Sequence, residues 1–325
     1  MRACYDLVAS GQREDDPAVP TIPYGMFRGW WAYGLSGEPQ ETWLAVGADG
    51  QPAGCYLLEL PDRENKTTAF LYPVVGLAAR RHGLGRALTG HAARRAGRAG
   101  RTLLSSNARA GSPGAAFARA IGAKVGFEEA RRVLEVGPEL PAALARVRAA
   151  AEPHAAGYRL RYWTGPAPED LVEQICALEA AMADAPHEDW FEPLTWDADR
   201  IRAADKRLLA QGVEQYSIGA VHEASGELAA LTQLVVTPGD SWGYQGMTAV
   251  VRPHRGHRLG LLLKAAMLEQ LPGLEPAVRQ VQTFNSVDNE HMVAVNDGLG
   301  HRVSGTFHGY ELDVAAAIES LPAQP

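Results

Sequence analysis

Two short stretches of basic residues and glycines are the parts of this sequence most suited to chemistry. The first, within residues 74–88, supplies Val74, Val75, Arg80, Arg81, His82, Gly83, Leu84, Gly85 and Arg86. The second, within residues 250–263, supplies Val250, Val251, Arg255, Gly256, His257, Arg258, Leu259 and Gly260. In each, a valine-rich strand leads through a basic turn into a helix. A helix N-terminus offers unpaired N–H groups and a partial positive charge to a phosphate, and arginine adds bidentate contacts. Each stretch therefore predicts a site for a diphosphate.

The two stretches belong to a longer internal repeat. Arg80, His82 and Gly85 recur 175 residues later as Arg255, His257 and Gly260. Downstream, Asn107 and Gly122 recur as Asn285 and Gly300, 178 residues later. Landmarks that keep register over this distance indicate a duplicated domain. We therefore expect an N-terminal domain over residues 1–140, a linker over 141–157 and a C-terminal domain over 158–325.

Composition narrows the class of protein. A chain of 325 residues with 46% hydrophobic residues is long enough for two cored domains. The net charge of −7 argues against a nucleic-acid or anionic-membrane partner. No apolar run approaches the roughly 18 residues that a membrane span needs. Three scattered cysteines indicate reduced thiols in a cytoplasmic protein, and no spacing of ligands predicts a metal site. The sequence leaves monomer and homodimer open.

Alternating and periodic patterns predict the elements that position the two turns. Residues 1–40, which are rich in glycine and proline, are expected to be irregular. In the first half we expect strands over residues 42–46, 54–60, 67–75, 102–106 and 131–136, and helices over 84–99 and 115–121. The linker is expected to contain a helix over 142–151. Turn signals at Asp49-Gly50 and Ser225-Gly226 indicate hairpins.

The second half repeats the alternation of strands and helices. We expect strands over residues 158–163, 213–221, 227–236, 242–251, 277–284 and 307–312, and helices over 169–182, 195–211, 259–271 and 289–298. Each half is therefore predicted to be a mixed sheet with flanking helices, so the fold class is α+β, an α/β sandwich.

The turns fit neither of two common nucleotide motifs. No Gly-Lys-Ser/Thr ends either stretch, which excludes a P-loop, and neither has the full Gly-x-Gly-x-x-Gly of a dinucleotide fold. A strand, then Arg-x-x-Gly-x-Gly, then a helix instead resembles the acyl-CoA-binding motif of the GCN5-related N-acetyltransferase (GNAT) superfamily. The tandem arrangement is similar to mycothiol-synthase-like and other actinobacterial two-domain acetyltransferases. His254 to Gly260, followed by Asn285, Asn289, Met292 and Asn296, resembles that group in particular.

The resemblance implies a site as well as a fold. The fourth and fifth strands of each domain would splay apart to hold the pantetheine arm of acetyl-CoA, with its pyrophosphate on residues 80–86 or 255–260. Amides near Val75 or Val250 would polarise the thioester carbonyl. Many members carry a tyrosine that protonates the leaving thiolate, four residues before a helix-ending glycine. Ala118 and Asn296 hold those positions here. Arg258 replaces the middle glycine of the second turn, so we expect its backbone to differ there.

Because Asn296 can donate a hydrogen bond and Ala118 cannot, the second domain is predicted to carry catalysis. Its cofactor would also contact Asn285 and Asn289. In this fold the acceptor would meet the segment between the first two helices. There Asp184, Glu188, Asp189 and Trp190 are candidate contacts, together with Gln245 on a strand. Glu188 and Asp189 are also candidate general bases.

The predicted activity is direct transfer of acetyl from acetyl-CoA to a small-molecule amine in a ternary complex. Two alternatives keep the protein an enzyme: the acceptor is a thiol, or the N-terminal domain carries out catalysis. A further alternative is a CoA-binding scaffold or sensor without turnover. A protein acceptor ranks last, because no basic docking surface is evident in the sequence.

Overall fold

The computed structural model describes residues 1–34 and 40–322, and the chain forms two compact units. Unit 1 consists of Met1–Glu129, Glu188–Glu192 and Thr306–Pro325. Unit 2 consists of Ala130–His187 and Pro193–Gly305. Each unit is therefore assembled from segments that are far apart in the sequence.

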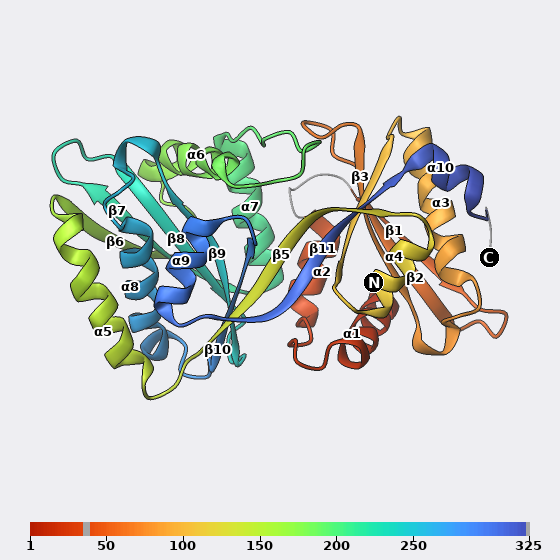
Figure 1. Cartoon of the computed structure of the whole chain (residues 1–325), viewed down its shortest axis with the longest axis horizontal. Helices are drawn as coiled ribbons and strands as arrows, with labels where there is room; N and C mark the ends of the chain where they lie inside the picture. Colours follow the sequence, from red (N-terminus) through yellow and green to blue (C-terminus); the bar gives the residue numbers. More distant parts are fainter. Residues whose placement is uncertain (35–39, 323–325) are drawn as a thin grey trace. The chain divides into compact units, whose positions relative to one another are not determined.

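Unit 1 is built on a mixed sheet with the strand order β1-β2-β3-β4-β11-β5 (Figure 1). These strands are β1 (Gln40–Val46), β2 (Pro52–Glu59), β3 (Thr68–Val75), β4 (Leu103–Arg109), β5 (Lys124–Glu135) and β11 (Arg302–Asp313). β1, β2 and β3 are antiparallel, β3 and β4 are parallel, and β4 is antiparallel to β11. Only the part of β5 up to Glu129 and the part of β11 from Thr306 onward belong to this unit.

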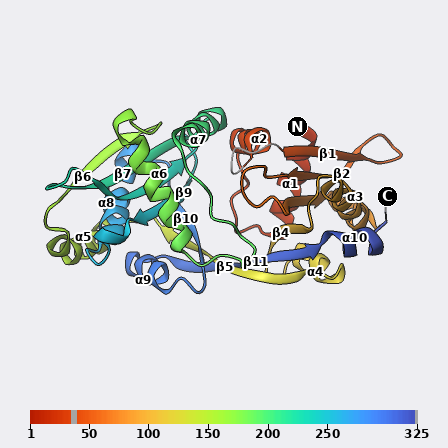
Figure 2. The ribbon, with the colours of Figure 1, turned by 90° about the horizontal axis from the view of Figure 1, so that it is seen from above.

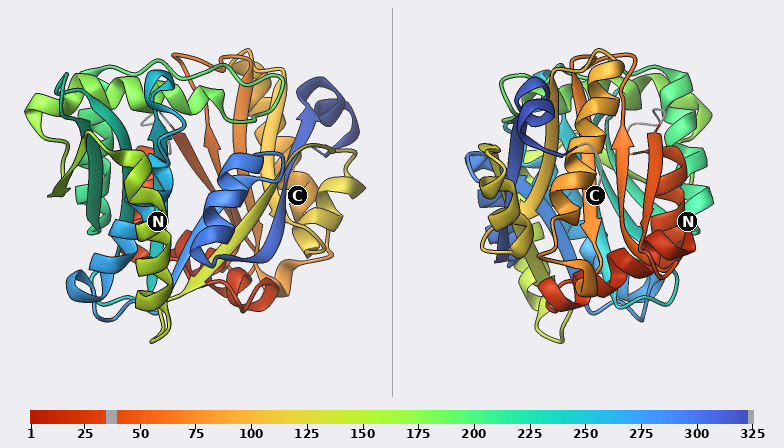
Figure 3. Two further views of the ribbon diagram at one scale, coloured as in Figure 1. Left: turned by 60° about the vertical axis from the view of Figure 1, so that its left-hand side comes forward. Right: turned by 90° about the vertical axis from the view of Figure 1, so that its right-hand side faces the viewer.

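Helices cover both faces of the unit 1 sheet. They are α1 (Arg2–Asp15), α2 (Tyr24–Tyr33), α3 (Leu84–Arg98), α4 (Pro113–Ala120) and α10 (Val314–Ser320). Strand alternation separates two cores. Cys55 and Leu57 pack with α1 and α2, whereas Tyr56 and Leu58 pack with α3 and α10. Figure 3 shows α1 and α3 on opposite sides of this sheet.

The expectation of an irregular segment over residues 1–40 is wrong where the structure describes it. α1 and α2 are helices, and their glycines Gly11 and Gly29 are buried. A glycine within a helix costs about 1 kcal/mol, but burying large side chains such as Phe27 and Trp31 offsets that cost. The prolines at 17, 20 and 23 lie between the helices. Residues 35–39 fall outside the described part.

Unit 2 repeats the arrangement with the strand order β5-β10-β9-β8-β7-β6 (Figure 2). Its further strands are β6 (Tyr158–Thr164), β7 (Glu214–His222), β8 (Leu228–Val236), β9 (Trp242–Val250) and β10 (Gln280–Ser286). β9 and β10 are parallel, and β6 to β9 are antiparallel. Both predicted hairpins are present, with Gly50 and Gly226 at positive φ.

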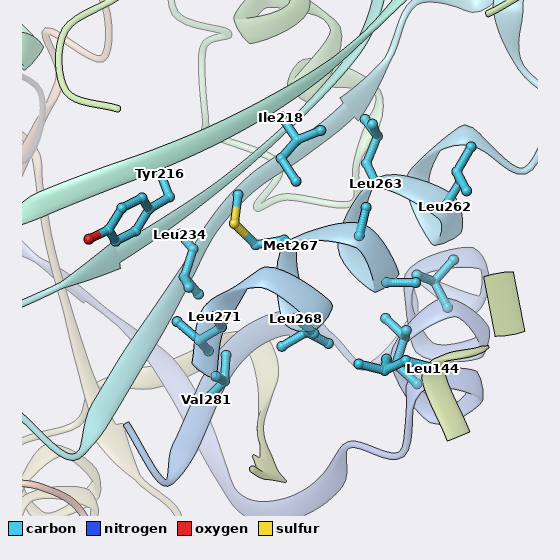
Figure 4. Close-up of a cluster of buried hydrophobic side chains, with 14 of the residues drawn as sticks. Leu144, Tyr216, Ile218, Leu234, Leu262, Leu263, Met267, Leu268, Leu271 and Val281 are labelled. Carbon is cyan, nitrogen blue, oxygen red and sulfur yellow. The ribbon is translucent and has the colours of Figure 1, made fainter. Parts of the chain in front are cut away.

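Two helical layers cover the sheet of unit 2. Its α-helices are α5 (Leu140–Ala151), α6 (Val172–Ala180), α7 (Ala198–Gln211), α8 (Leu259–Leu274) and α9 (Glu290–Leu299). α5, α8 and α9 form the larger core with β7, β8 and β10, in which Ile218, Leu234 and Val281 pack around Met267 (Figure 4). α6 and α7 pack on the other face through Ile175 and Ile201.

The fold class is confirmed: each unit is a mixed sheet flanked by helices. β5 and β11 extend well beyond the predicted 131–136 and 307–312, because both strands continue from one unit into the other. The division at residues 140 and 158 stays a prediction about separable domains. No helix in residues 1–34 and 40–322 is both long and apolar enough to cross a bilayer.

Candidate functional site

The parallel strands that precede the basic turns separate part-way along their length. The pairing of β3 with β4 ends at Phe70 and Ser105, although β3 continues to Val75. The pairing of β10 with β9 ends at Gln282 and Tyr244, although both strands continue. Each unit therefore has an opening between two splayed central strands. In unit 2 these are the expected fourth and fifth strands, β9 and β10, whereas in unit 1 they are the third and fourth, β3 and β4.

The first basic turn is a 3-10 segment, Leu77–Ala79, followed by the N-terminus of α3. Gly83 precedes the helix with a φ of 87°, and Arg81 has a φ of 67°. A side chain at Gly83 would meet no atom within 4 Å of its Cβ. Within the described residues, the N–H groups of residues 84–86 donate to no backbone acceptor. The turn therefore presents free backbone donors beside open space, which suits a phosphate group.

The second turn has the same sequence of backbone conformations with glycine and arginine exchanged. Gly256 corresponds to Arg81 and has a φ of 88°, whereas Arg258 corresponds to Gly83 and has a φ of 55°. A left-handed conformation costs a non-glycine residue about 1–2 kcal/mol. The difference at Arg258 is one of detail: the arginine stays in the left-handed region, with φ 55° and ψ 22° where Gly83 has φ 87° and ψ −12°.

The first arginine of each turn ties the turn to the end of the preceding strand. Arg80 Nε donates to the carbonyl oxygen of Val75 at 3.3 Å, and Arg255 Nε donates to that of Val250 at 3.1 Å. Arg80 also forms a bidentate pair with Asp15 of α1, with both N···O distances 2.7 Å. These hydrogen bonds raise the pKa of the Arg80 guanidinium. Both arginines therefore position their turns.

Asp184 takes the corresponding place at the second turn. Its carboxylate accepts from Arg252 at 3.0 and 2.5 Å and from Arg255 at 2.5 Å. The hydrogen bonds from Arg252, then those from Arg255, lower the pKa of the Asp184 carboxyl. This predicted acceptor contact is thus an ion-pair partner of the basic turn.

The turns differ in what their remaining basic side chains contact. Arg81 and His82 are exposed and form no hydrogen bond or ion pair within residues 1–34 and 40–322. In contrast, Arg258 donates to the carbonyl oxygen of Ala150 at 3.1 Å, and His257 Nδ1 lies 3.0 Å from that of His154. The first turn therefore presents an unengaged guanidinium and an unengaged imidazole, and the second turn is held by α5 and the segment after it.

The remaining predicted cofactor contacts line the two turns. Those of unit 1 are Val74 on the α1 face, Val75 on the α3 face, half-buried Leu84 and Gly85, and exposed Arg86. Those of unit 2 are Val250 and Val251, which pack on opposite faces of the sheet, and buried Leu259 and Gly260. A Cβ at Gly85 would lie 3.2 Å from the ring of Phe117, so a side chain here would press against that ring.

The asparagines predicted for the second domain belong to a buried chain of hydrogen bonds. Lys264 Nζ donates to Asn296 Oδ1 at 2.6 Å, and Asn296 Nδ2 donates to Asn285 Oδ1 at 3.1 Å. Asn285 Nδ2 donates in turn to the carbonyl oxygen of Ser286 at 2.8 Å. Lys264 and Asn296 are each 1% exposed, and burial lowers the pKa of Lys264 to about 7. The amide of Asn296 is therefore engaged at both ends. Asn289 caps α9 by accepting from the Met292 N–H at 3.1 Å.

The predicted acceptor residues are divided between the units. Asp184 and Gln245 belong to unit 2, where Gln245 Nε2 donates to the carbonyl oxygen of Gln233 at 2.6 Å. Glu188, Asp189 and Trp190 belong to unit 1, which contains the first turn. Of these three, Trp190 lies near the point where β3 and β4 separate, with its ring centroid 5.9 Å from that of Phe70.

Sequence reasoning missed several residues that build these sites. Asp15 lies in the segment expected to be irregular, so nothing indicated that it would pair with Arg80. Lys264 lies on an apolar helix. A single lysine among leucines and alanines in the sequence could have indicated a buried amine. Glu311 falls on the last strand, whose pairing with β4 is a tertiary fact that no local pattern encodes.

The geometry of the site agrees with comparisons to known proteins. The sequence profile of the Acetyltransferase (GNAT) family matches residues 3–119. A solved tandem GNAT protein from the clavulanic acid biosynthesis pathway is 30% identical, with 96% of this chain and 94% of that chain covered and a TM-score of 0.78. This chain belongs to the GNAT family. Its two units form the tandem arrangement of that family.

Other solved structures share the fold of this tandem GNAT protein. A GCN5-related N-acetyltransferase from Sphaerobacter thermophilus is 18% identical over 96% of this chain and 92% of that chain, with a TM-score of 0.66. A putative acetyltransferase from Pyrococcus horikoshii is 13% identical over 95% and 85%, with a TM-score of 0.54. No curated protein sequence matches the chain.

Membership of the GNAT family makes the protein an acyltransferase of a family that uses acetyl-CoA. Within the described residues, no group of three or more histidine, cysteine or carboxylate side chains is placed to hold a metal ion.

Proposed function

We propose that this protein transfers acetyl from acetyl-CoA to the amine of a small molecule, and that unit 1 binds the cofactor and performs the reaction. The observation that carries the choice of unit is the contrast between the turns. Arg81 and His82 are exposed and unengaged, whereas the chain's own carbonyl groups occupy Arg258 and His257. A diphosphate at the second turn would have to compete with those contacts.

The residues of unit 1 fit the cofactor in three respects. The N–H groups of residues 84–86 are oriented by α3, and the helix dipole favours an anion there. Gly83 leaves open space above them. Arg81 adds positive charge to oppose the diphosphate, and His82 adds a ring N–H donor. Acetyl-CoA, when bound, supplies the thioester whose acyl carbon is attacked.

The opening between β3 and β4 would then hold the reacting groups. From Val75 to Phe70, where the strands meet again, β3 spans roughly 17 Å at about 3.3 Å per residue. Tyr72 lies in this stretch, and burial, then the charge of Glu59, raises the pKa of its phenol. Tyr72 therefore stays protonated and is available as a hydrogen-bond donor. Ala118 supplies no acid, so the thiolate would leave without the usual tyrosine.

Native mass spectrometry with acetyl-CoA tests the cofactor site. Gly83→Trp places a bulky side chain in the first turn, and Gly256→Trp is the matched control. Gly256 is also exposed, at a φ of 88° with nothing within 4 Å of a Cβ, so both variants carry similar strain. We expect one bound ligand per chain, lost in Gly83→Trp and kept in Gly256→Trp. Loss of the ligand in Gly256→Trp alone would place the cofactor site in unit 2. Absence of bound ligand on the folded wild type would contradict the proposal that the protein uses acetyl-CoA.

Release of CoA with a panel of small amines tests the transfer itself. Sustained release that depends on the amine supports the enzyme. Tight binding of acetyl-CoA without release in the presence of any amine would instead favour a CoA sensor. Release with thiols and not with amines would overturn the choice of acceptor.

A further inference from the structure

Two of the three cysteines meet in the interior of unit 1. Cys4 lies in the first turn of α1, and Cys55 lies on β2, 51 residues later in the sequence. They are 1% and 0% exposed and belong to one core cluster with Phe27, Trp31 and Leu57. Their side chains share a hydrogen bond. The two thiols are therefore direct neighbours, although nothing in their spacing along the sequence indicates it.

The packing of α1 on β2 explains independently why these two residues meet. A Cβ at Gly76 would lie 2.9 Å from Leu7 Cδ2 and 3.0 Å from the carbonyl oxygen of Ala53, so Leu7 of α1 lies close to Ala53 of β2. Cys4 precedes Leu7 by three residues and therefore shares its face of the helix. Cys55 follows Ala53 by two residues and shares its face of the sheet. The helix thus runs opposite to the strand here, and the cysteines form the next contact between them.

The shared hydrogen bond gives the two thiols different reactivity. The hydrogen bond from Cys55 lowers the pKa of the Cys4 thiol, although burial opposes it. The hydrogen bond to Cys4, and then burial, raises the pKa of the Cys55 thiol. The thiolate is the form that attacks an oxidant, and a neighbouring thiol can then resolve the oxidised sulfur. Cys4 therefore suits the attacking role and Cys55 the resolving role.

The first turn of α1 gives a small oxidant a route to Cys4. Within the described residues, no side chain caps this turn and no acidic residue lies in it. Capping groups and acidic residues stabilise the start of a helix, and a helix end opens more easily than a helix centre. A small neutral molecule such as hydrogen peroxide can therefore reach the Cys4 sulfur when this turn opens.

We propose that Cys4 and Cys55 are an oxidation-sensitive pair that closes to a disulfide in the presence of a peroxide and so fastens α1 to β2. The Cys4 thiolate attacks one peroxide oxygen, the O–O bond breaks, and hydroxide leaves behind a sulfenic acid. The Cys55 sulfur then attacks the Cys4 sulfur, the S–O bond breaks, and the oxygen leaves as water with the Cys55 proton. The hydroxide takes up the proton that Cys4 had released, so two thiols are oxidised and one peroxide is reduced to two waters.

The disulfide would act on the helix that positions the first basic turn. Asp15 of α1 forms the bidentate pair with Arg80, and a Cβ at Gly11 would lie 3.3 Å from Arg80 Nη2. A cross-link between residues 4 and 55 also restricts the unfolded chain, which favours the folded state. The oxidised protein should therefore hold α1 in place more firmly than the reduced protein. This inference goes beyond the proposed function and does not depend on it.

Counting free thiols in the full chain before and after peroxide treatment tests the pair. The reduced, folded protein is treated with hydrogen peroxide, then denatured and labelled with N-ethylmaleimide, and its intact mass gives the number of labels. We expect three labels before treatment and one after it, with peptide mapping that shows Cys4 joined to Cys55. Three labels after treatment, or a loss of labels without this linked peptide, would overturn the proposal.

Variants with one cysteine replaced assign the disulfide. Cys176 of α6 is the matched control, since it is 7% exposed and, within the described residues, its core cluster contains no other cysteine. Cys176→Ala should fall from two labels to none. Cys4→Ala and Cys55→Ala should form no disulfide within the chain, and a disulfide in either variant would contradict the assignment.

Thermal unfolding of the peroxide-treated wild type tests whether the disulfide fits the folded protein. Its midpoint should lie roughly 5–10 °C above that of the reduced protein, and dithiothreitol should remove this shift. Cys55→Ala treated in the same way should show no shift that dithiothreitol reverses. A disulfide that forms but leaves the midpoint unchanged, or lowers it, would contradict a cross-link that fastens α1 in its folded position.

Discussion

Replacing Lys264 by methionine should change how the stability of unit 2 depends on pH. The amine of Lys264 is buried against Asn296, and burial lowers its pKa from 10.5 to about 7. In the unfolded chain the lysine holds its proton up to its ordinary pKa, so the unfolded state binds more protons between pH 7 and 10.5. The free energy of unfolding therefore rises with pH in this window, and this contribution is lost as the pH falls through 7.

The size of the effect follows from the pKa of Lys264 in the folded and unfolded chain. A pKa difference of one between the two states corresponds to about 1.36 kcal/mol of free energy. Half of the folded molecules carry the charge at pH 7 and about 1% carry it at pH 9, so the wild type should gain about 2 kcal/mol over this interval. Lys264→Met has no amine to titrate and should lose this gain. It also leaves the Oδ1 of Asn296 without its donor, which costs about 1–3 kcal/mol at every pH.

The free energy of unfolding of unit 2 can be measured by urea unfolding at a series of pH values. Hydrogen exchange of the α8 amides reports on this unit. The quantity to compare is the difference between wild type and Lys264→Met, in which the contributions of other titrating groups cancel. Lys206→Met, on the exposed side of α7, is the control and should run parallel to the wild type. Parallel curves for wild type and Lys264→Met from pH 7 to 9 would refute the buried neutral amine.

Three other substitutions test the structure of the turns and cores. Asp15→Asn removes the charged partner of Arg80, so we expect the free energy of unfolding to fall by about 1 kcal/mol. We also expect acetyl-CoA to bind several-fold more weakly by calorimetry. Unchanged binding would show that the ion pair of Asp15 and Arg80 does not shape the turn. Leu231→Ala, at a fully buried position, should lower the free energy of unfolding by about 2–5 kcal/mol, and a loss below about 1 kcal/mol in urea titration would contradict the packing described. Asn289→Ala removes the cap of α9 and should cost about 1 kcal/mol while acetyl-CoA affinity stays the same; a weaker affinity would make this asparagine a cofactor contact.

Much of the fold was predictable from the sequence because its signals are local. Alternating residues indicate β6, and the Ser225-Gly226 turn indicates the hairpin of β7 and β8. The valine-rich strand, basic turn and helix identify both turns to within a residue or two. The helix predicted over 84–99 is confirmed as α3, and the linker helix as α5. The repeat at 175 residues correctly indicates two copies of one fold, since duplication preserves spacing as well as residue type.

The site was less predictable because its contacts join segments that are distant in the sequence. Nothing local tells that Glu188 and Trp190 pack in unit 1, or that Arg80 pairs with an acid 65 residues earlier. The glycines of α1 and α2 suggested irregular structure because their helix propensity is poor, whereas tertiary burial decides the outcome. Gly126 and Gly309 gave no signal at all, since their role is to leave space for the carboxylates of other segments.

The pairing of β11 with β4 has a consequence for how the chain becomes folded during synthesis. Residues 307–313 supply the neighbour of β4 on the side away from β3, yet they are translated about 200 residues after it. Until they leave the ribosome, the β4 edge of the first sheet remains open, and an open edge invites pairing with other chains. The nascent chain therefore carries an unfinished sheet through most of its translation, and stalling before residue 306 would release a product that is prone to associate with itself.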